Sequence, residues 1–204
     1  MSPTRIVPEH RLCVYCGSSP GQNPAFAKAA VNLGTALARA GVGLVYGGGA
    51  IGLMGEVAKA VLNAGGHVTG IIPEFLVKKE RMLDGVNELI VTRSMHERKT
   101  LMFEKSTGFV ALPGGIGTLE ELAEITTWAQ LNQHAKPIII ADIEGYWGHL
   151  LQLLDHMRAE GFIRAETDVF LDVAKTVDEV LPLYHQRLTT ARPKVPLAAI
   201  RKQL

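Results

Sequence analysis

The 204-residue chain has no strong charge of one sign, no long apolar run and few cysteines. Its 21 Lys and Arg residues nearly balance 20 Asp and Glu residues, so it lacks the broad basic footprint that nucleic-acid binding usually needs. No apolar run is long enough to span a bilayer, and the N-terminus lacks the apolar core of a signal peptide. We therefore expect a cytoplasmic protein that binds neither nucleic acid nor membrane.

The two cysteines, Cys13 and Cys16, are separated by two residues within a predicted strand. Side chains three apart in a strand point to opposite faces, so we expect no disulfide between them. The C-x-x-C spacing also occurs in metal and redox sites, but no second Cys/His pair completes a metal set. A redox motif should also begin a helix. These cysteines are therefore interpreted as buried thiols, and no metal site is predicted.

Short apolar runs alternate with helical patterns along the chain, which predicts an α/β fold. The predicted strands are 12–16, 43–46, 67–72, 88–91, 108–112, 137–141 and, more weakly, 169–173, and the predicted helices are 24–40, 53–64, 95–106, 119–131, 146–160 and 177–188. Several strands are apolar throughout, as strands buried on both faces should be. We expect one Rossmann-like domain over residues 1–188, a doubly wound parallel sheet with helices on both faces. Residues 189–204 are predicted to form a C-terminal tail.

In an open parallel sheet, ligands bind outside the carboxyl ends of the strands, so the loops after the strands are the candidates for function. The first such loop, 16–19, fits either a ligand contact or a simple turn. The second loop, 47–52, matches G-x-G-x-x-G. The acidic residue that a dinucleotide site needs is missing, because the next strand ends in Pro73 before Glu74. We therefore expect Gly48 and Gly49 to lie close to some other ligand.

The strongest single signal is the loop 113–121, with the sequence PGGIGTLEE, which leads from a strand into a helix. Its glycines allow an anion to approach the backbone, and the helix N-terminus adds N–H groups and partial positive charge, so a phosphate fits there. The loop lacks the Lys of a Walker A motif, which argues against an ATPase. An alternative is that Thr118 and Glu121 form a capping box and merely satisfy backbone donors.

The helix predicted from Met95 carries two cations on its apolar face. Residues 95, 98, 99, 102, 103 and 106 recur at helical spacing, which places Arg98 and Lys99 among apolar neighbours. Cations directed inward are costly unless an anion meets them, such as a phosphate or a catalytic carboxylate. The alternative is that both side chains extend past the core to the surface.

Three motifs together, VYGGGAIGLMG, SMHERK and PGGIGTLEE, resemble those of the LOG family of cytokinin riboside 5′-monophosphate phosphoribohydrolases. The resemblance extends from about residue 12 to about residue 188. It implies a Rossmann-like homodimer that hydrolyses a cytokinin riboside 5′-monophosphate, or AMP, to free base and ribose 5-phosphate without a metal or organic cofactor. Such proteins are often called lysine decarboxylases. That chemistry normally needs a pyridoxal-binding Lys, and no lysine here stands in a suitable context.

The resemblance implies that Arg98 and Glu121 are the catalytic pair. Glu121 would stabilise the positive charge that develops on the ribose and orient the attacking water. Which of Glu120 and Glu121 faces the sugar stays open at this point. The predicted substrate contacts are Gly48, Gly49, Glu80, Met95, Lys99, Gly114, Gly115, Ile116, Gly117, Thr118, Glu120 and Thr127. Met54 and Trp128 are expected to shape the pocket for the base.

Two other functions are compatible with the same fold. One is a binding module without turnover, as in the similar molybdenum-cofactor carrier proteins. The presence of both Arg98 and Glu121 favours the enzyme. The other is a DNA-processing Rossmann protein, which the near-neutral charge disfavours.

Overall fold

The computed structural model describes residues 7–77, 81–165, 169 and 171–190. In these residues seven parallel strands form one sheet with the order β4-β3-β2-β1-β5-β6-β7. The strands are β1 (Arg11–Tyr15), β2 (Gly43–Tyr46), β3 (Val68–Pro73), β4 (Glu88–Thr92), β5 (Gly108–Ala111), β6 (Ile138–Ala141) and β7 (Asp172–Ala174). Every neighbouring pair is parallel, from β3–β4 at one edge to β6–β7 at the other. The predicted parallel sheet is confirmed.

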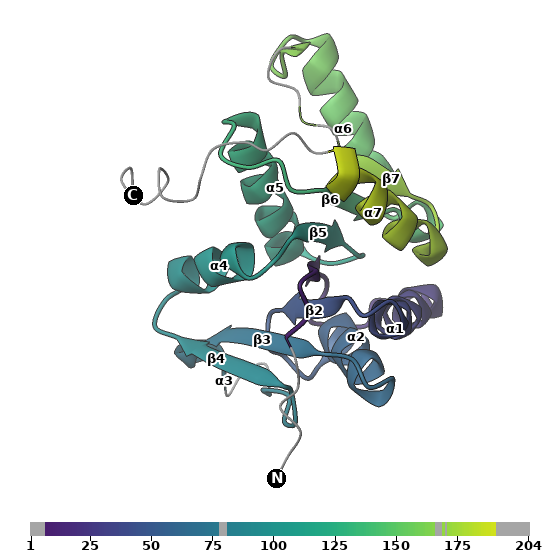
Figure 1. The fold of residues 1–204 in the computed structure, drawn as a ribbon. Helices are drawn as coiled ribbons and strands as arrows, with labels where there is room; N and C mark the ends of the chain where they lie inside the picture. Colours follow the sequence, from purple (N-terminus) through teal and green to yellow (C-terminus); the bar gives the residue numbers. More distant parts are fainter. Residues whose placement is uncertain (1–6, 78–80, 166–168, 170, 191–204) are drawn as a thin grey trace.

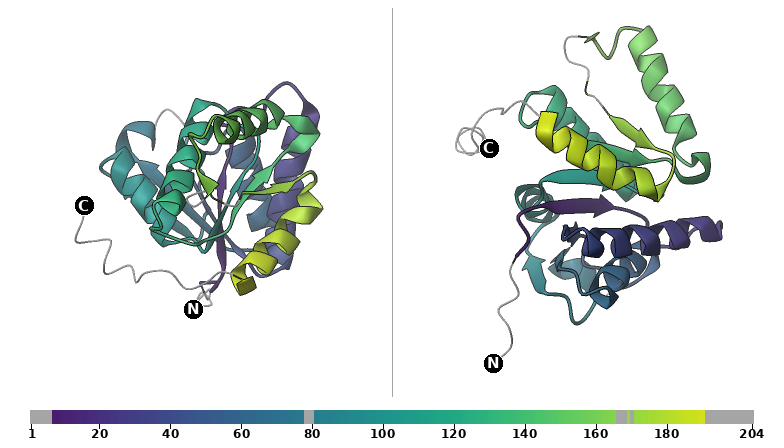
Figure 2. Two further views of the ribbon diagram at one scale, coloured as in Figure 1. Left: turned by 90° about the horizontal axis from the view of Figure 1, so that it is seen from above. Right: turned by 45° about the vertical axis from the view of Figure 1, so that its right-hand side comes forward.

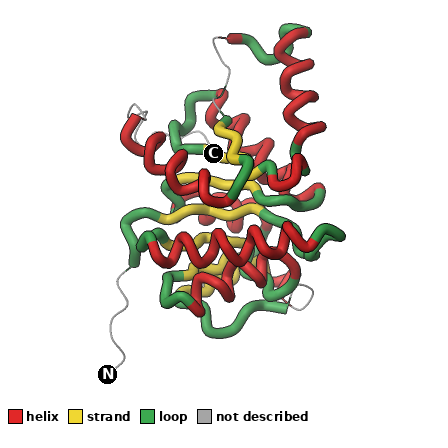
Figure 3. Tube along the Cα trace, turned by 90° about the vertical axis from the view of Figure 1, so that its right-hand side faces the viewer, coloured by secondary structure: helices red, strands yellow, loops and turns green. Residues whose placement is uncertain are grey.

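Helices cover both faces of the sheet, as Figure 1 shows. They are α1 (Pro24–Arg39), α2 (Gly52–Asn63), α3 (Glu74–Val77), α4 (Met95–Glu104), α5 (Ile116–Gln130), α6 (Gly148–Ala159) and α7 (Val180–Thr190), with short 3₁₀ turns η1 (Ile143–Gly145) and η3 (Val177–Glu179). One apolar cluster joins α1, α2 and α7 to the sheet, and a second joins α4 and α5 to the opposite face. Figure 2 gives two further views, and Figure 3 shows α1 and α7 lying in front of the strands.

The predicted elements agree with the structure to within two residues at most ends. Helix α5 begins at Ile116 and not at residue 119, because the backbone turns into the helix directly after the glycines. Strand β7 and helix α7 also begin three residues later than predicted, and the short helix α3 was not predicted. Helix α7 runs to Thr190, so the first two residues of the predicted tail are helical and the rest lie outside the described residues. In the described ranges, no helix combines the length and apolar character needed to cross a membrane.

The chain winds in two directions from the centre of the sheet, which determines where a ligand can bind. Strand β1 has β2 on one side and β5 on the other. The order reverses there, and such a switch point opens a crevice between the loops that follow β1 and β5. The loop 113–121 follows β5 and therefore lies at this crevice.

The two cysteines behave as buried thiols. Cys13 belongs to the apolar cluster on one face of the sheet and Cys16 to the cluster on the other, and neither forms a disulfide. Burial raises the pKa of the Cys13 thiol to about 12. Burial, with a smaller contribution from the Glu121 carboxylate, also raises the pKa of Cys16 far above its ordinary value. Neither thiol is therefore a nucleophile at neutral pH.

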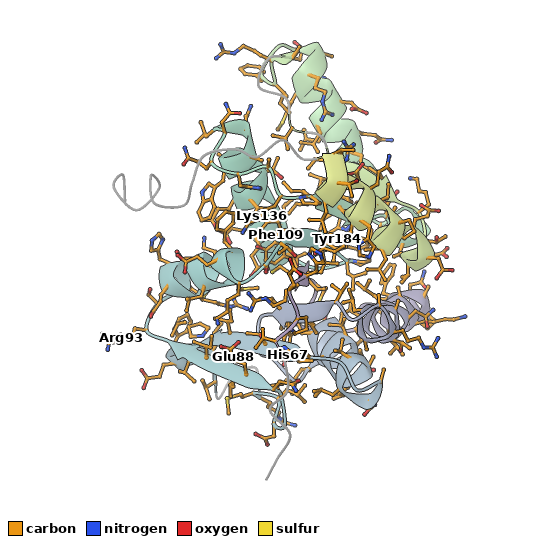
Figure 4. The ribbon with its side chains drawn as sticks, viewed as in Figure 1. His67, Glu88, Arg93, Phe109, Lys136 and Tyr184 are labelled. Atoms are coloured by element: carbon orange, nitrogen blue, oxygen red, sulfur yellow. The ribbon has the colours of Figure 1, made fainter. Side chains whose placement is uncertain are left out.

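Lys136 covers the aromatic part of the core beneath α4 and α5. Its Nζ lies 3.7 Å from the centre of the Phe103 ring and 5.8 Å from that of Phe109, and it donates to the Phe103 carbonyl at 2.6 Å. Figure 4 labels Lys136 beside Phe109. Burial lowers the pKa of Lys136 from 10.5 to about 8, in spite of these favourable contacts.

We expect the stability of wild type relative to a Lys136→Met variant to increase as pH rises from about 8 towards 10.5. In this window the folded protein releases the Lys136 proton while the unfolded chain keeps it, so raising the pH favours folding. The expected gain is about 1–3 kcal/mol. Urea unfolding of both proteins at pH 7 and pH 10 measures it, and equal pH dependence in the two proteins would contradict the lowered pKa.

Helices α1 and α2 pack closely because Gly34 has no side chain. A Cβ at position 34 would lie 2.4 Å from the Val57 carbonyl oxygen and 2.8 Å from the Ala60 Cβ. These are contacts that no ordinary side chain makes, and they lie at the interface that joins the two helices. In contrast, nothing lies within 4 Å of a Cβ at Gly148, the first residue of α6.

Gly34→Ala should therefore destabilise the protein by about 1–3 kcal/mol, because overpacking outweighs the better helix propensity of alanine. Gly148→Ala is the matched control and should be neutral or slightly stabilising. Urea denaturation gives both free energies of unfolding. A Gly34→Ala variant as stable as wild type would show that α1 and α2 can separate at little cost.

Candidate active site

Three loops meet at the carboxyl edge of the central strands. The Gly17 N–H donates to the Pro113 carbonyl at 3.1 Å, and the Gly17 carbonyl accepts from the Met54 N–H at 3.3 Å. Gly52 has a φ of +62°, and a Cβ there would lie 2.4 Å from the Ser18 backbone. The loop after β1 thus joins the loops after β2 and β5 through its backbone. The loop after β1 therefore has a structural role in connecting the other two loops. Ser18 in this loop is exposed at the surface.

The loop after β5 exposes the first turn of α5. Gly115 is the N-cap and no side chain caps the helix, and the first helical bond runs from Leu119 N–H to the Gly115 carbonyl at 3.1 Å. The preceding N–H groups, at Ile116, Gly117 and Thr118, therefore have no partner within the helix. Residues 115–117 are exposed, with Ile116 81% exposed. This geometry suits an anion.

The capping-box alternative is wrong. A capping box requires Thr118 before the helix as the N-cap, but Thr118 is the third residue inside α5. Its side chain is buried against Gly114, where an added Cβ would lie only 2.2 Å from Oγ1 of Thr118 and 2.9 Å from the Gly17 nitrogen. Gly114 is therefore held between α5 and the loop after β1.

Arg98 of α4 is buried and lies at the centre of the site, as the helical spacing predicted. Its Nε donates to the Ile71 carbonyl at 3.1 Å and its Nη2 to the Gly47 carbonyl at 3.3 Å. Its Nη1 lies 3.7 Å from Oε1 of Glu121, whose side chain is also almost fully buried. The Met95 sulfur lies 3.9 Å from the same nitrogen. The predicted catalytic pair is thus an inward-facing cation beside a carboxylate.

The glycine loop after β2 makes room for Arg98 and for a second segment. A Cβ at Gly47 would lie 2.2 Å from Nη2 of Arg98. The next residues pair with 81–83: the Gly48 carbonyl accepts from Leu83 N–H at 3.1 Å, and the Gly49 backbone bridges to Met82. The structure therefore gives these glycines packing roles, and substrate contact by Gly48 and Gly49 stays a prediction. The predicted contact Glu80 lies outside the described residues.

Glu120 and Glu121 are adjacent but have different partners. Lys99 Nζ lies 2.7 Å from Oε1 of Glu120 and 2.9 Å from Oε1 of Glu124. Burial lowers the pKa of Lys99, but the hydrogen bonds that its ammonium donates to these carboxylates outweigh this effect and raise the pKa above its usual value. Thus Glu121 faces Arg98 in the interior, while Glu120 faces Lys99 and is more exposed.

Thr127 lies on the same side of α5 as Glu120 and Glu124, because residues three and seven apart share a helix face. It is exposed, and its hydroxyl donates to the Ala123 carbonyl at 2.8 Å. The structure therefore does not bring Thr127 to the Arg98–Glu121 pair. Trp128 packs edge-on against Phe103, with 5.2 Å between ring centres.

Several contributors to this site were not predicted from the sequence. Two are the backbone carbonyls of Gly47 and Ile71, which no sequence pattern reveals. A third is Tyr146, whose hydroxyl donates to the Gly114 carbonyl. The signal for Tyr146 in the sequence is its position after β6, at the same edge of the sheet. Among the residues that the structure describes, no three His, Cys, Asp or Glu side chains gather as a metal site.

Comparisons of the chain with known proteins found a family model and several relatives. A family model described as "Possible lysine decarboxylase" matches residues 54–183. The probable cytokinin riboside 5′-monophosphate phosphoribohydrolase LOGL9 of Oryza sativa subsp. japonica is 53% identical over 153 residues, which cover 75% of this chain and 67% of that protein. The cytokinin riboside 5′-monophosphate phosphoribohydrolase LOG1 of Arabidopsis thaliana is 49% identical over 153 residues, covering 75% and 72% respectively.

Among solved structures, the Moco carrier protein from Chlamydomonas reinhardtii superposes with a TM-score of 0.68. The alignment covers 89% of this chain and 98% of the carrier protein, at 23% sequence identity. At this identity the likeness shows the shared fold alone.

The packing of Gly47 against Arg98 can be measured with a double-mutant cycle. Gly47→Ala should destabilise the protein by about 1–3 kcal/mol, because its Cβ would displace a guanidinium held by two carbonyls. In an Arg98→Ala background the same substitution should cost less by about 0.5–3 kcal/mol. Urea unfolding of the four proteins measures this coupling. Additive effects would show that Gly47 is required for a reason other than room for Arg98.

Proposed function

This chain belongs to the LOG family of cytokinin riboside 5′-monophosphate phosphoribohydrolases, whose family model carries the lysine decarboxylase description, and we propose that it performs their reaction. It hydrolyses the N-glycosidic bond of a nucleoside 5′-monophosphate and releases the free base and ribose 5-phosphate. The substrate class is a cytokinin riboside 5′-monophosphate or AMP. The observation that carries the proposal is the buried Arg98–Glu121 pair beside the exposed first turn of α5.

Helix α5 sets the distance between the proposed phosphate site and the carboxylate of Glu121. We assign the phosphate to the backbone amides of residues 115–118, where the helix N-terminus attracts negative charge. Glu121 lies five residues beyond Ile116, which is about 7.5 Å along the helix axis. A ribose attached to that phosphate extends towards the carboxylate. One helix therefore supplies both the phosphate site and the group that acts on the sugar.

Cleavage of the N-glycosidic bond builds positive charge on the ribose ring, and the carboxylate of Glu121 stabilises it. The same carboxylate orients the attacking water and accepts its proton. Arg98 has a positioning role in this scheme, because two carbonyls fix the guanidinium and its Nη1 lies 3.7 Å from Glu121. The fixed cation stabilises the negative charge of Glu121 in a largely dry site.

Lys99 is assigned to a different part of the site. Its ammonium lies between Glu120 and Glu124, with one cation facing two carboxylates. We propose that Lys99 holds Glu120 at the edge of the crevice, where Glu120 can accept hydrogen bonds from the ribose hydroxyls.

We also propose that the protein is a homodimer, as the resemblance to the family implies, and that it is cytoplasmic. Support comes from α6, in which no described side chain is fully buried. Large apolar side chains are exposed on or next to α5 and α6, at Leu131, Leu153 and Phe162. Such surface suits contact with a second copy of the chain.

The alternative function is a nucleotide or cofactor carrier without turnover. Its support is the shared fold with the Moco carrier protein. A carrier has no need for a buried carboxylate beside the bound sugar, so the Arg98–Glu121 pair favours the enzyme. Turnover of AMP or isopentenyladenosine 5′-monophosphate separates the two.

Glu121→Gln should lower kcat by about 10²–10³-fold, because the amide keeps the shape of the side chain but loses its charge. Arg98→Ala should also lower kcat, since Glu121 loses its fixed cation. Free base is measured by chromatography, and ribose 5-phosphate is measured in the same samples.

The matched control is Glu56→Gln, which makes the same change from acid to amide in an exposed ion pair of α2. It should keep wild-type kinetics. Full activity of Glu121→Gln would sink its catalytic assignment. Binding of AMP by wild type without any release of base would instead support the carrier.

A further inference from the structure

The loop after β6 is built to present one aromatic side chain to the proposed phosphate loop. It contains two consecutive residues with left-handed backbone, Glu144 with a φ of 53° and Gly145 with a φ of 70°. A non-glycine residue rarely adopts this conformation, and the strain persists only where the surroundings impose it. Here the surroundings are a set of contacts made by Asp142 and Tyr146.

Asp142 fixes the two ends of this loop. It is buried at the end of β6, and its Oδ1 accepts from the Trp147 N–H at 2.7 Å. Its Oδ2 lies 2.6 Å from the ammonium of Lys175, which follows β7. The Gly145 N–H donates to the Asp142 carbonyl at 3.2 Å and closes the turn. The position of Tyr146 is therefore fixed by buried hydrogen bonds and an ion pair.

The Tyr146 side chain crosses to the phosphate loop. Its ring packs edge-on against Phe26 of α1, with 5.3 Å between ring centres, and against Trp147. Its hydroxyl donates to the Gly114 carbonyl at 2.5 Å. Tyr146 is 41% exposed, so one side of the ring remains open to solvent while the hydroxyl is engaged.

The Gly114 carbonyl belongs to the same peptide group as the Gly115 N–H. In a planar trans peptide these two groups point in opposite directions, so the direction of the carbonyl sets that of the N–H. A peptide between two glycines turns over more easily than any other, because neither residue has a Cβ to restrict it. Nothing lies within 4 Å of the position of a Cβ at Gly115. The Tyr146 hydroxyl thus opposes rotation of this peptide.

We propose that Tyr146 is a positioning residue that locks the Gly114–Gly115 peptide so that the Gly115 N–H points to the 5′-phosphate of the substrate. This inference rests on the proposed function, because it places the phosphate at the first turn of α5. Tyr146 acts through the backbone and touches no reacting atom. Its effect should therefore fall on the affinity for phosphate-bearing ligands and not on the chemical step.

The test is Tyr146→Phe, which removes the hydroxyl and keeps the ring against Phe26. Loss of one hydrogen bond of ordinary strength predicts a rise of about 2- to 12-fold in KM for AMP, with kcat within about twofold of wild type. The dissociation constant of ribose 5-phosphate, measured by calorimetry, should rise by the same factor. That of adenosine, which lacks the phosphate, should be unchanged.

Tyr184→Phe is the matched control, because it removes a hydroxyl that also makes a 2.5 Å hydrogen bond, in this case with Oγ1 of Thr107. Tyr184 lies on α7, away from the phosphate loop, and is labelled in Figure 4. Its kinetic constants and ligand affinities should match those of wild type.

Every outcome of these binding measurements supports or overturns the proposed role of Tyr146. Unchanged affinity of Tyr146→Phe for ribose 5-phosphate would overturn it, as would equal weakening of ribose 5-phosphate and adenosine. If wild type binds AMP without cleaving it, the proposed function fails, while the dissociation constants still test Tyr146. If wild type binds neither AMP nor ribose 5-phosphate, the phosphate loop and the role of Tyr146 both fail.

Discussion

The buried guanidinium of Arg98 is the constraint on which the site depends. A cation removed from water needs partners on every side, and here they come from the ends of β2 and β3 and from α5. These partners fix the position of α4 relative to the sheet and to the carboxylate of Glu121. The same constraint explains why position 47 is a glycine, because any side chain there would occupy the place of Nη2 of Arg98.

The glycines of the site allow segments of the protein to pack closely against one another, as well as allowing a ligand to come near the backbone. The G-x-G-x-x-G pattern at 47–52 looks like a dinucleotide loop, yet Gly47 borders Arg98 and Gly52 borders Ser18. Gly114 is held in the same way between Thr118 and Gly17. A glycine pattern therefore indicates that something comes near the backbone. It does not indicate whether that neighbour is a phosphate or another loop.

The sequence predicted the sheet, the order of elements and the inward direction of Arg98, because alternation and helical spacing are local properties of the chain. It did not predict that α5 starts at Ile116, since glycines at a helix start look like a loop. It also left open which of Glu120 and Glu121 faces the crevice. That choice depends on where α4 lies relative to α5, which is a tertiary property. Tyr146 was missed for the same reason, since its partner Gly114 is 32 residues away.

The positions of the charged side chains determine how a phosphate can be held. Arg98 already meets two carbonyls and lies near Glu121, and Lys99 already meets Glu120 and Glu124. We therefore assign the charge of a phosphate at the first turn of α5 mainly to the backbone N–H groups and the helix dipole. Amides hold an anion only if they point at it. The orientation of each peptide in the loop is then more important than in a site where a flexible lysine follows the phosphate, and this is why we propose a role in binding for the tyrosine on the Gly114 carbonyl.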